Sequence, residues 1–285
     1  MIDGKYEVKL MEKINVYYCV DKKFLVQLVL SLISLANHTK AELNVINLTV
    51  EVPEYNKKGK KFTEKEDALC EKILKEANPK STFKSIDVSD LFRKYLLKGP
   101  NLNNKYYSYY VTVRLLADLV PEIPDKVIYL DADTIFVGDV KELWNIDVDN
   151  VEMAGRRDIY RLSKYLQSGV MLLNMKKIRE SGTFKKACKL CCEKKYYWYI
   201  DMSALNTACR KKKLISKRYN SYKYHKNCII HHVCSTREGR VPLTKKWHHR
   251  IKTDEEEFMK KLYPQYNYIY KELDRIRKRQ YAQFV

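Results

Sequence analysis

Two patterns of apolar residues recur along this chain, continuous short runs and residues at helical spacing. Short runs rich in β-branched and aromatic residues predict buried strands at 14–20, 43–52, 83–88, 127–130 and 170–174. Between them, apolar residues recur at helical spacing, which predicts helices at 24–37, 64–77 and 106–119 and a basic helix running from 175 towards Lys194. Strands that alternate with helices indicate an α/β fold whose sheet is covered on both faces.

The C-terminal segment has a different pattern. From 255 to 285, apolar residues at roughly helical spacing stand beside a group of lysines and arginines. Such a basic helix can lie on an anionic membrane surface, or it can dock its apolar stripe on the rest of the protein. We therefore predict a catalytic domain at 1–250 and a basic, aromatic helical tail at 251–285, and leave both arrangements open.

Composition narrows the class of protein. The 285 residues are 45% hydrophobic and include only seven Pro and eight Gly, which is typical of a folded chain. Lys and Arg number 55 against 35 Asp and Glu, so the surface favours phosphates, nucleic acid or an acidic membrane leaflet. The 23 tyrosines can stack on bases, but no RNA-binding fingerprint accompanies them, and no nucleic-acid partner is expected.

The cysteines and the N-terminus indicate a location in the cell. The eight cysteines lie mostly inside apolar segments, which is typical of reduced, cytosolic thiols. Cys188, Cys191 and Cys192 have ligand-like spacing for zinc, although helical packing explains them more simply. The most apolar run, 24–36, is shorter than the about 20 residues that span a bilayer. We expect neither an export signal nor a transmembrane anchor, and a cytoplasmic protein, peripheral on the inner face of the plasma membrane if the tail binds lipid.

Two carboxylates follow the apolar strand at 127–130. Asp131 and Asp133 stand two positions apart where ligands collect in α/β sheets, beyond the carboxyl end of a strand. Ionised carboxylates this close repel each other unless a cation or proton compensates, and a hard divalent metal does so. The simpler explanation is that both aspartates cap the next turn.

Several blocks in order resemble one enzyme family. The segment 125–134, DKVIYLDADT, followed by GDV at 138–140 and ELW at 142–144, resembles the metal-site block of family 8 glycosyltransferases. The strand at 14–21, RLL at 114–116, SGVMLLN at 168–174, Asp201 with ALN at 204–206, and IIH at 229–231 are similar to further blocks of that family. The resemblance implies a GT-A fold, a mixed central sheet and retaining transfer, as in the bacterial lipopolysaccharide galactosyl- and glucosyltransferases.

The resemblance also implies roles for individual residues. The metal ligands would be Asp131, Asp133 and His231, for Mn²⁺ or Mg²⁺. His232 is the competing ligand, because adjacent side chains on a strand point to opposite faces, and a packed histidine is the simpler alternative for His231. The predicted donor-binding residues are Asp21, Lys22, Arg114, Asp131, Ala132 and Lys245, with Asp21 near uracil and ribose, Arg114 near the sugar and Lys245 at a phosphate.

Some positions depart from the family pattern. Gln167 replaces an amide-bearing Asn, and Asp201-Met202-Ser203 keeps only the first residue of a D-Q-D motif. Lys245 follows an insertion-like stretch, 235–244, so Lys246 and Arg240 are its rivals. Asp201 and Gln167 are the predicted catalytic residues; Asp201 would serve either as a nucleophile or by stabilising oxocarbenium character.

The function predicted from these residues is metal-dependent transfer of a hexose, galactose or glucose, from a UDP-sugar to a hydroxyl of a glycan or glycolipid. The alternative is a protein on the same fold that binds a nucleotide sugar or a polyanion without turnover.

Overall fold

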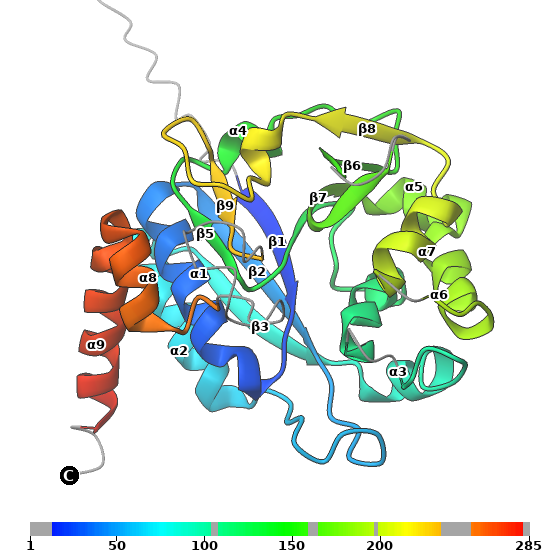
Figure 1. Cartoon of the computed structure of the whole chain (residues 1–285), viewed down its shortest axis with the longest axis horizontal. Coiled ribbons are helices and arrows are strands. Elements are labelled where there is room, and N and C mark those ends of the chain that lie inside the picture. Colours follow the sequence, from blue (N-terminus) through cyan, green and yellow to red (C-terminus); the bar gives the residue numbers. More distant parts are fainter. Residues whose placement is uncertain (1–12, 104–107, 159–164, 197–198, 235–251, 282–285) are drawn as a thin grey trace, which may run out of the picture.

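A seven-stranded mixed sheet forms the centre of the protein (Figure 1). The computed structural model describes residues 13–103, 108–158, 165–196, 199–234 and 252–281. Its strand order is β3-β2-β1-β4-β7-β6-β8, in which β7 runs antiparallel to both β4 and β6, and the other neighbouring strands pair in parallel. The strands are β1 (Lys13–Cys19), β2 (Glu42–Thr49), β3 (Thr82–Asp87), β4 (Lys126–Leu130), β6 (Met153–Arg157), β7 (Leu166–Asn174) and β8 (Lys212–Ile215). The predicted α/β class with a mixed central sheet is confirmed.

Helices cover both faces of this sheet, each over its own hydrophobic core. One face carries α1 (Leu25–His38), α2 (Glu64–Ala77), α8 (Glu256–Leu262) and α9 (Asn267–Tyr281). The other carries α3 (Ser89–Tyr95), the 3₁₀ helix η2 (Tyr109–Leu119), α5 (Met175–Ser181), α6 (Thr183–Glu193) and α7 (Ile200–Ala208). Shorter elements are η1 (Lys22–Phe24), α4 (Lys141–Trp144), η3 (Lys217–Tyr219) and η4 (Pro264–Tyr266).

The pairing of β1 with β4 sets the position of the site. These strands are parallel, with Val16 opposite Ile128 and Tyr17 opposite Tyr129. Both strands are buried on both faces, which is why each reads as a nearly continuous apolar run. Their carboxyl ends therefore deliver Asp21 and Asp131 to the same edge of the sheet.

A second, two-stranded sheet lies beside this edge. It pairs β5 (Thr134–Phe136) with β9 (Ile230–His232), antiparallel, with Thr134 opposite His232. Two buried serines of α1 hold β5, because the Ser31 hydroxyl lies 3.1 Å from that of Thr134 and the Phe136 amide donates to Ser34 Oγ at 3.0 Å. The chain immediately after the two aspartates is thus fixed on α1.

The C-terminal helices are docked on the protein, which is one of the two arrangements expected for the tail. Ile269, Tyr270 and Leu273 of α9 are buried in the same core as α1. The basic residues on α9, from Lys271 to Arg279, are exposed. Among the helices of the described residues, none is both long enough and apolar enough to cross a bilayer.

Three elements differ from the sequence prediction. The helix predicted at 106–119 is a 3₁₀ helix over 109–119. The basic helix after 175 is two helices, because the chain turns at Gly182, whose φ of +65° is in the left-handed region that glycine adopts at little cost. The strand predicted from 170 begins at Leu166, so Gln167, Ser168 and Gly169 belong to β7.

Candidate metal and donor site

The two aspartates occupy the turn between β4 and β5. Asp131 follows the last residue of β4, and its amide donates to Gly169 O at 2.8 Å, which ties the turn to β7. The Thr134 hydroxyl donates to Asp131 O at 2.8 Å and closes the turn on the other side. The side chains of Asp131 and Asp133 remain 27% and 35% exposed, whereas Ala132 between them is buried in the core. The carboxylates of Asp131 and Asp133 therefore lie on the same side of the turn.

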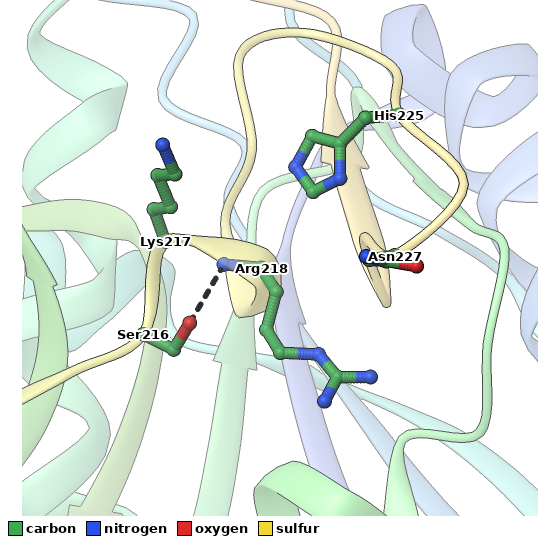
Figure 2. A pocket seen from close by; sticks show the side chains of 5 residues that line it. All are labelled: Ser216, Lys217, Arg218, His225 and Asn227. Carbon is green, nitrogen blue, oxygen red and sulfur yellow. Dashed lines mark hydrogen bonds between the residues drawn. The ribbon is translucent and has the colours of Figure 1, made fainter.

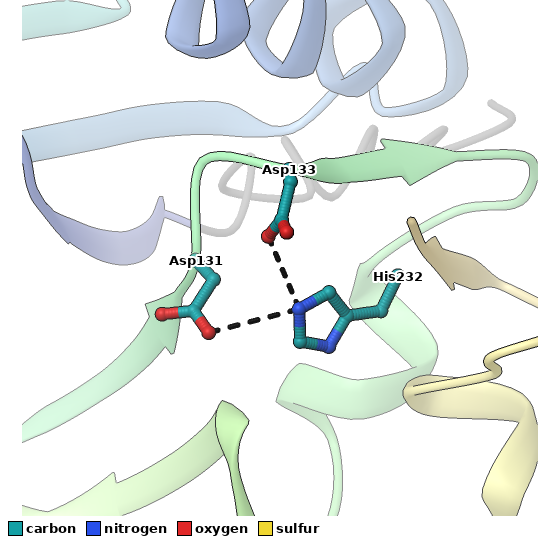
Figure 3. Close-up of side chains that lie close together, drawn as sticks. All are labelled: Asp131, Asp133 and His232. Carbon is teal, nitrogen blue, oxygen red and sulfur yellow. Dashed lines mark ion pairs between the residues drawn. The ribbon is translucent and has the colours of Figure 1, made fainter. Parts of the chain in front are cut away.

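His232 of β9 completes a three-residue cluster with these carboxylates (Figure 3). Its Nε2 lies 3.1 Å from Asp133 Oδ1 and 3.6 Å from Asp131 Oδ2. One ligand atom from each residue falls within 4.8 Å of the others. Ligands at right angles on bonds of about 2.1 Å lie about 3 Å apart, so the cluster fits a single divalent ion.

The expectation that His231 is the histidine beside the aspartates is corrected by the structure. His231 points to the opposite side of β9, where its Nδ1 lies 2.8 Å from the hydroxyl of Tyr266. The pairing with β5 decides this, because His232 stands opposite Thr134, next to Asp133, and successive side chains alternate. The Val233 amide also donates to Asp133 O at 2.9 Å, which holds β9 against the turn.

Arg114 and Tyr129 orient Asp131. Both reach its Oδ1, the Tyr129 hydroxyl at 2.5 Å and Arg114 Nη2 at 2.9 Å, so that Oδ2 remains towards His232. Burial raises the pKa of Asp131 above its ordinary value and Asp133 adds to this, whereas Arg114 and His232 lower it. A bound cation would act in the same direction as Arg114 and favour the ionised form.

Arg114 connects this aspartate with the predicted catalytic one. Its guanidinium is 7% exposed and lies 3.3 Å from Asp201 Oδ2 through Nε, while Nη1 donates to Ser168 O at 2.8 Å. The Ser168 hydroxyl donates to the same Asp201 oxygen at 2.9 Å. Asp201 lies in the first turn of α7, two residues after Tyr199, a non-glycine residue with a φ of +52°. Strained backbone of this kind is concentrated at functional sites.

Gly169 leaves the space that His232 occupies. A Cβ atom on Gly169 would lie 2.1 Å from His232 Cε1 and 2.7 Å from Asp131 Oδ2. Its amide donates to Gln167 Oε1 at 2.7 Å, and Gln167 also accepts a hydrogen bond from Asn220. Gln167, a predicted catalytic residue, is therefore connected with the metal cluster through Gly169 and Asn220.

The predicted nucleoside residues lie at the end of β1. Asp21 is buried and accepts a hydrogen bond from the Lys23 amide at 3.1 Å, while Lys22 pairs with Glu66 at 3.0 Å. Burial, together with the Asp21 carboxylate, raises the pKa of Tyr110 to about 12. The Tyr110 hydroxyl is buried, and its backbone neighbour Val52 lowers the same pKa. Lys245, Lys246 and Arg240 lie outside the described residues.

The alternative zinc site is not formed by the cysteines. Cys188 and Cys191 are buried in the core under α6, and Cys192 Sγ donates to Tyr95 O at 3.1 Å. In the part of the chain that the structure describes, Asp131, Asp133 and His232 form the one group with metal-ligand spacing. None of the eight cysteines, all of which lie in the described residues, forms a disulfide.

A separate cavity of about 590 Å³ opens between η3 and the loop before β9 (Figure 2). It is lined by Ser216, Lys217, Arg218, His225 and Asn227. Its lining is basic and does not include the aspartates. Because η3 leads directly into Asn220, this cavity borders the loop that reaches His232.

Sequence reasoning missed three residues of this site: Asn220, Tyr129 and Ser168. Tyr129 and Ser168 lay inside blocks that carried the resemblance, where a polar hydroxyl within an apolar strand is the available signal. Asn220 stands in an irregular loop with no periodic pattern. His232 was predicted only as the ligand that competes with His231.

The sequence is similar to known glycosyltransferases. A sequence profile described as glycosyl transferase family 8 matches residues 15–280. GlyF of Streptococcus pneumoniae is 31% identical over 132 residues, which are 44% of this chain and 31% of GlyF. GlyE of the same organism is 34% identical over 80 residues, 28% of this chain and 18% of GlyE. The matches span about a third of the length of the first curated relatives.

Solved structures share the fold. The apo form of GlyE from Streptococcus pneumoniae superposes with a TM-score of 0.59 at 20% identity, over 92% of this chain and 63% of that one. The galactosyltransferase LgtC, solved with donor and acceptor sugar analogues, gives a TM-score of 0.56 at 17% identity, over 78% and 88% of the two chains. The protein therefore has the GT-A fold.

Proposed function

Since this chain belongs to glycosyl transferase family 8, we propose that it transfers a hexose, galactose or glucose, from a UDP-sugar to an acceptor hydroxyl, with retention at the anomeric carbon. The observation that carries the proposal is the cluster of Asp131, Asp133 and His232 at the carboxyl end of β4. A growing surface glycan or glycolipid is the proposed acceptor, and cysteines that form no disulfides support a cytoplasmic reaction.

We propose Mn²⁺ as the ion, because two carboxylates and an imidazole are a borderline-hard ligand set that suits Mn²⁺ at least as well as Mg²⁺. When bound, it supplies Lewis-acid stabilisation of the departing diphosphate. The protein's part is to hold Asp131 Oδ2 and Asp133 towards one point. Tyr129 and Arg114 do this for Asp131 by occupying its other oxygen.

Asp201 and Gln167 are the proposed residues at the sugar. Arg114 and Ser168 fix one oxygen of Asp201, which supports a carboxylate held in a single orientation near the metal ligands. Asp201 acts either as a nucleophile, or it stabilises oxocarbenium character while the departing phosphate helps to deprotonate the acceptor. Each nitrogen of the Arg114 guanidinium has a partner among Asp131, Asp201 and backbone carbonyls, so we assign it a positioning role besides any donor contact.

The donor's nucleoside is proposed to bind at the end of β1, where Asp21 and the buried hydroxyl of Tyr110 lie close to Gly59. Lys22 would contribute positive charge beside the diphosphate. Lys245 stays a predicted phosphate contact.

A second candidate is nucleotide-sugar binding without turnover. It is favoured by Met202, a buried apolar side chain in the turn of α7 that carries Asp201. An amide at this position would offer hydrogen bonds to sugar hydroxyls, which a thioether does not.

The test measures hydrolysis of a panel of UDP-hexoses with Mn²⁺, without and with EDTA. The proposal expects release of UDP from at least one donor, abolished by EDTA and lowered roughly a hundredfold or more by Asp133→Ala. Asp149→Asn, which removes an exposed carboxylate in a surface turn, is the matched control and should hydrolyse donor like the wild type. Mn²⁺-dependent binding of a UDP-sugar with no release of UDP across the panel would favour the second candidate.

A further inference from the structure

We propose that Asn220 is a positioning residue that selects the tautomer of His232 and so prepares its Nε2 to bind the metal. This inference rests on the proposed metal site and deepens it. Asn220 is fully buried and lies in the loop between η3 and β9, outside the motifs that carry the resemblance. Its side chain connects Gln167 on one side with His232 on the other.

The directions of these hydrogen bonds follow from one backbone group. The amide of Gly169 can only donate, and it donates to Gln167 at 2.7 Å, so the atom of Gln167 that faces it is the oxygen. The same oxygen contacts the Asn220 side chain, which must present its NH₂ group there. The Asn220 oxygen therefore faces His232 Nδ1, at 3.0 Å.

An oxygen at Nδ1 requires a proton on Nδ1. A histidine that binds a metal is neutral and carries only one ring proton, so Nε2 then presents its lone pair. Nε2 is the atom that faces Asp131 and Asp133. The relay from Gly169 through Gln167 and Asn220 thus favours the tautomer that coordinates an ion between the carboxylates.

The backbone around Asn220 keeps this side chain in place. The Asn220 carbonyl accepts from Arg156 Nη1 at 2.7 Å, and Arg156 stacks on the ring of Tyr222 at 4.1 Å. The His232 amide donates to Ser221 O at 2.8 Å, which couples the loop directly to β9. Asn220 and His232 are therefore held at a fixed separation by main-chain contacts as well.

The relay also limits what Gln167 offers a donor sugar. Its oxygen already accepts two hydrogen bonds, from Gly169 and Asn220, which uses both lone pairs. Only the NH₂ group of Gln167 remains. A sugar hydroxyl that contacts it must act as the acceptor.

Calorimetric titration with Mn²⁺ alone, in the absence of sugar nucleotide, tests the positioning role. Asn220→Leu removes both hydrogen bonds and should weaken Mn²⁺ binding about 10- to 100-fold. Asn220→Asp keeps an oxygen for His232 Nδ1 but loses the NH₂ group that faces Gln167, so it should bind Mn²⁺ more weakly than the wild type and at least about threefold more tightly than Asn220→Leu. Asn78→Leu removes another buried asparagine, at the end of α2, and should bind Mn²⁺ like the wild type.

Nitrogen NMR of histidine-labelled protein with Mg²⁺ reads the tautomer directly, with the His232 signal assigned from His232→Gln. The proton is expected on Nδ1 in the wild type and in Asn220→Asp. Unchanged Mn²⁺ affinity in Asn220→Leu, or a proton on Nε2 in the wild type, overturns the relay. Neither readout depends on turnover, so a wild type that binds Mn²⁺ normally but hydrolyses no donor refutes the proposed function and leaves the relay intact.

Discussion

Replacing Gly169 by alanine is expected to damage the metal site through one methyl group. The new Cβ would lie 2.1 Å from His232 Cε1, 2.8 Å from His232 Nδ1 and 2.7 Å from Asp131 Oδ2. Non-bonded carbon atoms rest at about 3.5–4.0 Å, so the imidazole has to move by more than about 1 Å. His232 is almost fully buried and held by Asn220, which leaves it little room for this movement.

Overpacking of this kind costs about 1–3 kcal/mol of folding stability. Because the displaced atoms belong to metal ligands, Mn²⁺ affinity should fall at least about tenfold, which corresponds to about 1.4 kcal/mol. Urea denaturation measures the first quantity and titration calorimetry the second.

Gly155→Ala is the matched control for this substitution. Gly155 lies on β6, the strand next to β7, opposite Met171, and a Cβ there would meet its nearest neighbours at 3.5–3.6 Å, an ordinary contact. Stability and Mn²⁺ affinity should both stay close to wild type. The steric reasoning is refuted if Gly169→Ala binds Mn²⁺ with wild-type affinity and unfolds at the wild-type urea midpoint.

Two further predictions concern stability. Asn206→Ala should lower the free energy of unfolding in urea by about 1–3 kcal/mol. The Asn206 side chain is hydrogen-bonded to the amide and the carbonyl of Leu166, both at 2.7 Å, and the substitution leaves both groups without that partner. An unchanged urea midpoint would contradict this. Burial raises the pKa of Asp118 to about 6 from 3.8, so the folded state binds the proton more tightly and Asp118 lowers stability as pH rises from about 4 to 6. Asp118→Asn should therefore be as stable as the wild type near pH 4 and about 1–3 kcal/mol more stable at pH 7. Urea denaturation curves at both pH values measure this difference. No gain in stability at pH 7 would refute the prediction.

Local patterns predicted the elements that build the main sheet. The runs that became β1, β2 and β4 are buried on both faces, so their apolar character is visible without knowledge of the fold. Helix α2 was predicted over its full length, Glu64–Ala77, from the helical spacing of its apolar residues, and the structure adds a capping box of Thr63 and Glu66 at its start. The three-residue strands β5 and β9 are too short to give any periodic signal.

The candidate site was predicted as far as its residues lie on those elements. Asp131 and Asp133 could be named because they follow a predicted strand, and Asp201 because its segment resembles a motif of the family. The choice between His231 and His232 depends on how β9 pairs with β5, and no local pattern encodes a register between segments about a hundred residues apart. Asn220 acts through contacts to β7 and β9 that exist only in the folded protein.

The hydrogen bond between His231 and Tyr266 joins the C-terminal helices to β9, the strand that carries His232 of the metal cluster. Tyr266 belongs to η4, which leads into α9. One face of β9 therefore contacts the C-terminal segment, and the other faces the two aspartates of the metal cluster. A substitution that displaces side chains on either face moves the same three-residue strand, β9. His231 therefore anchors β9 on the C-terminal helices, which restrains its neighbour His232.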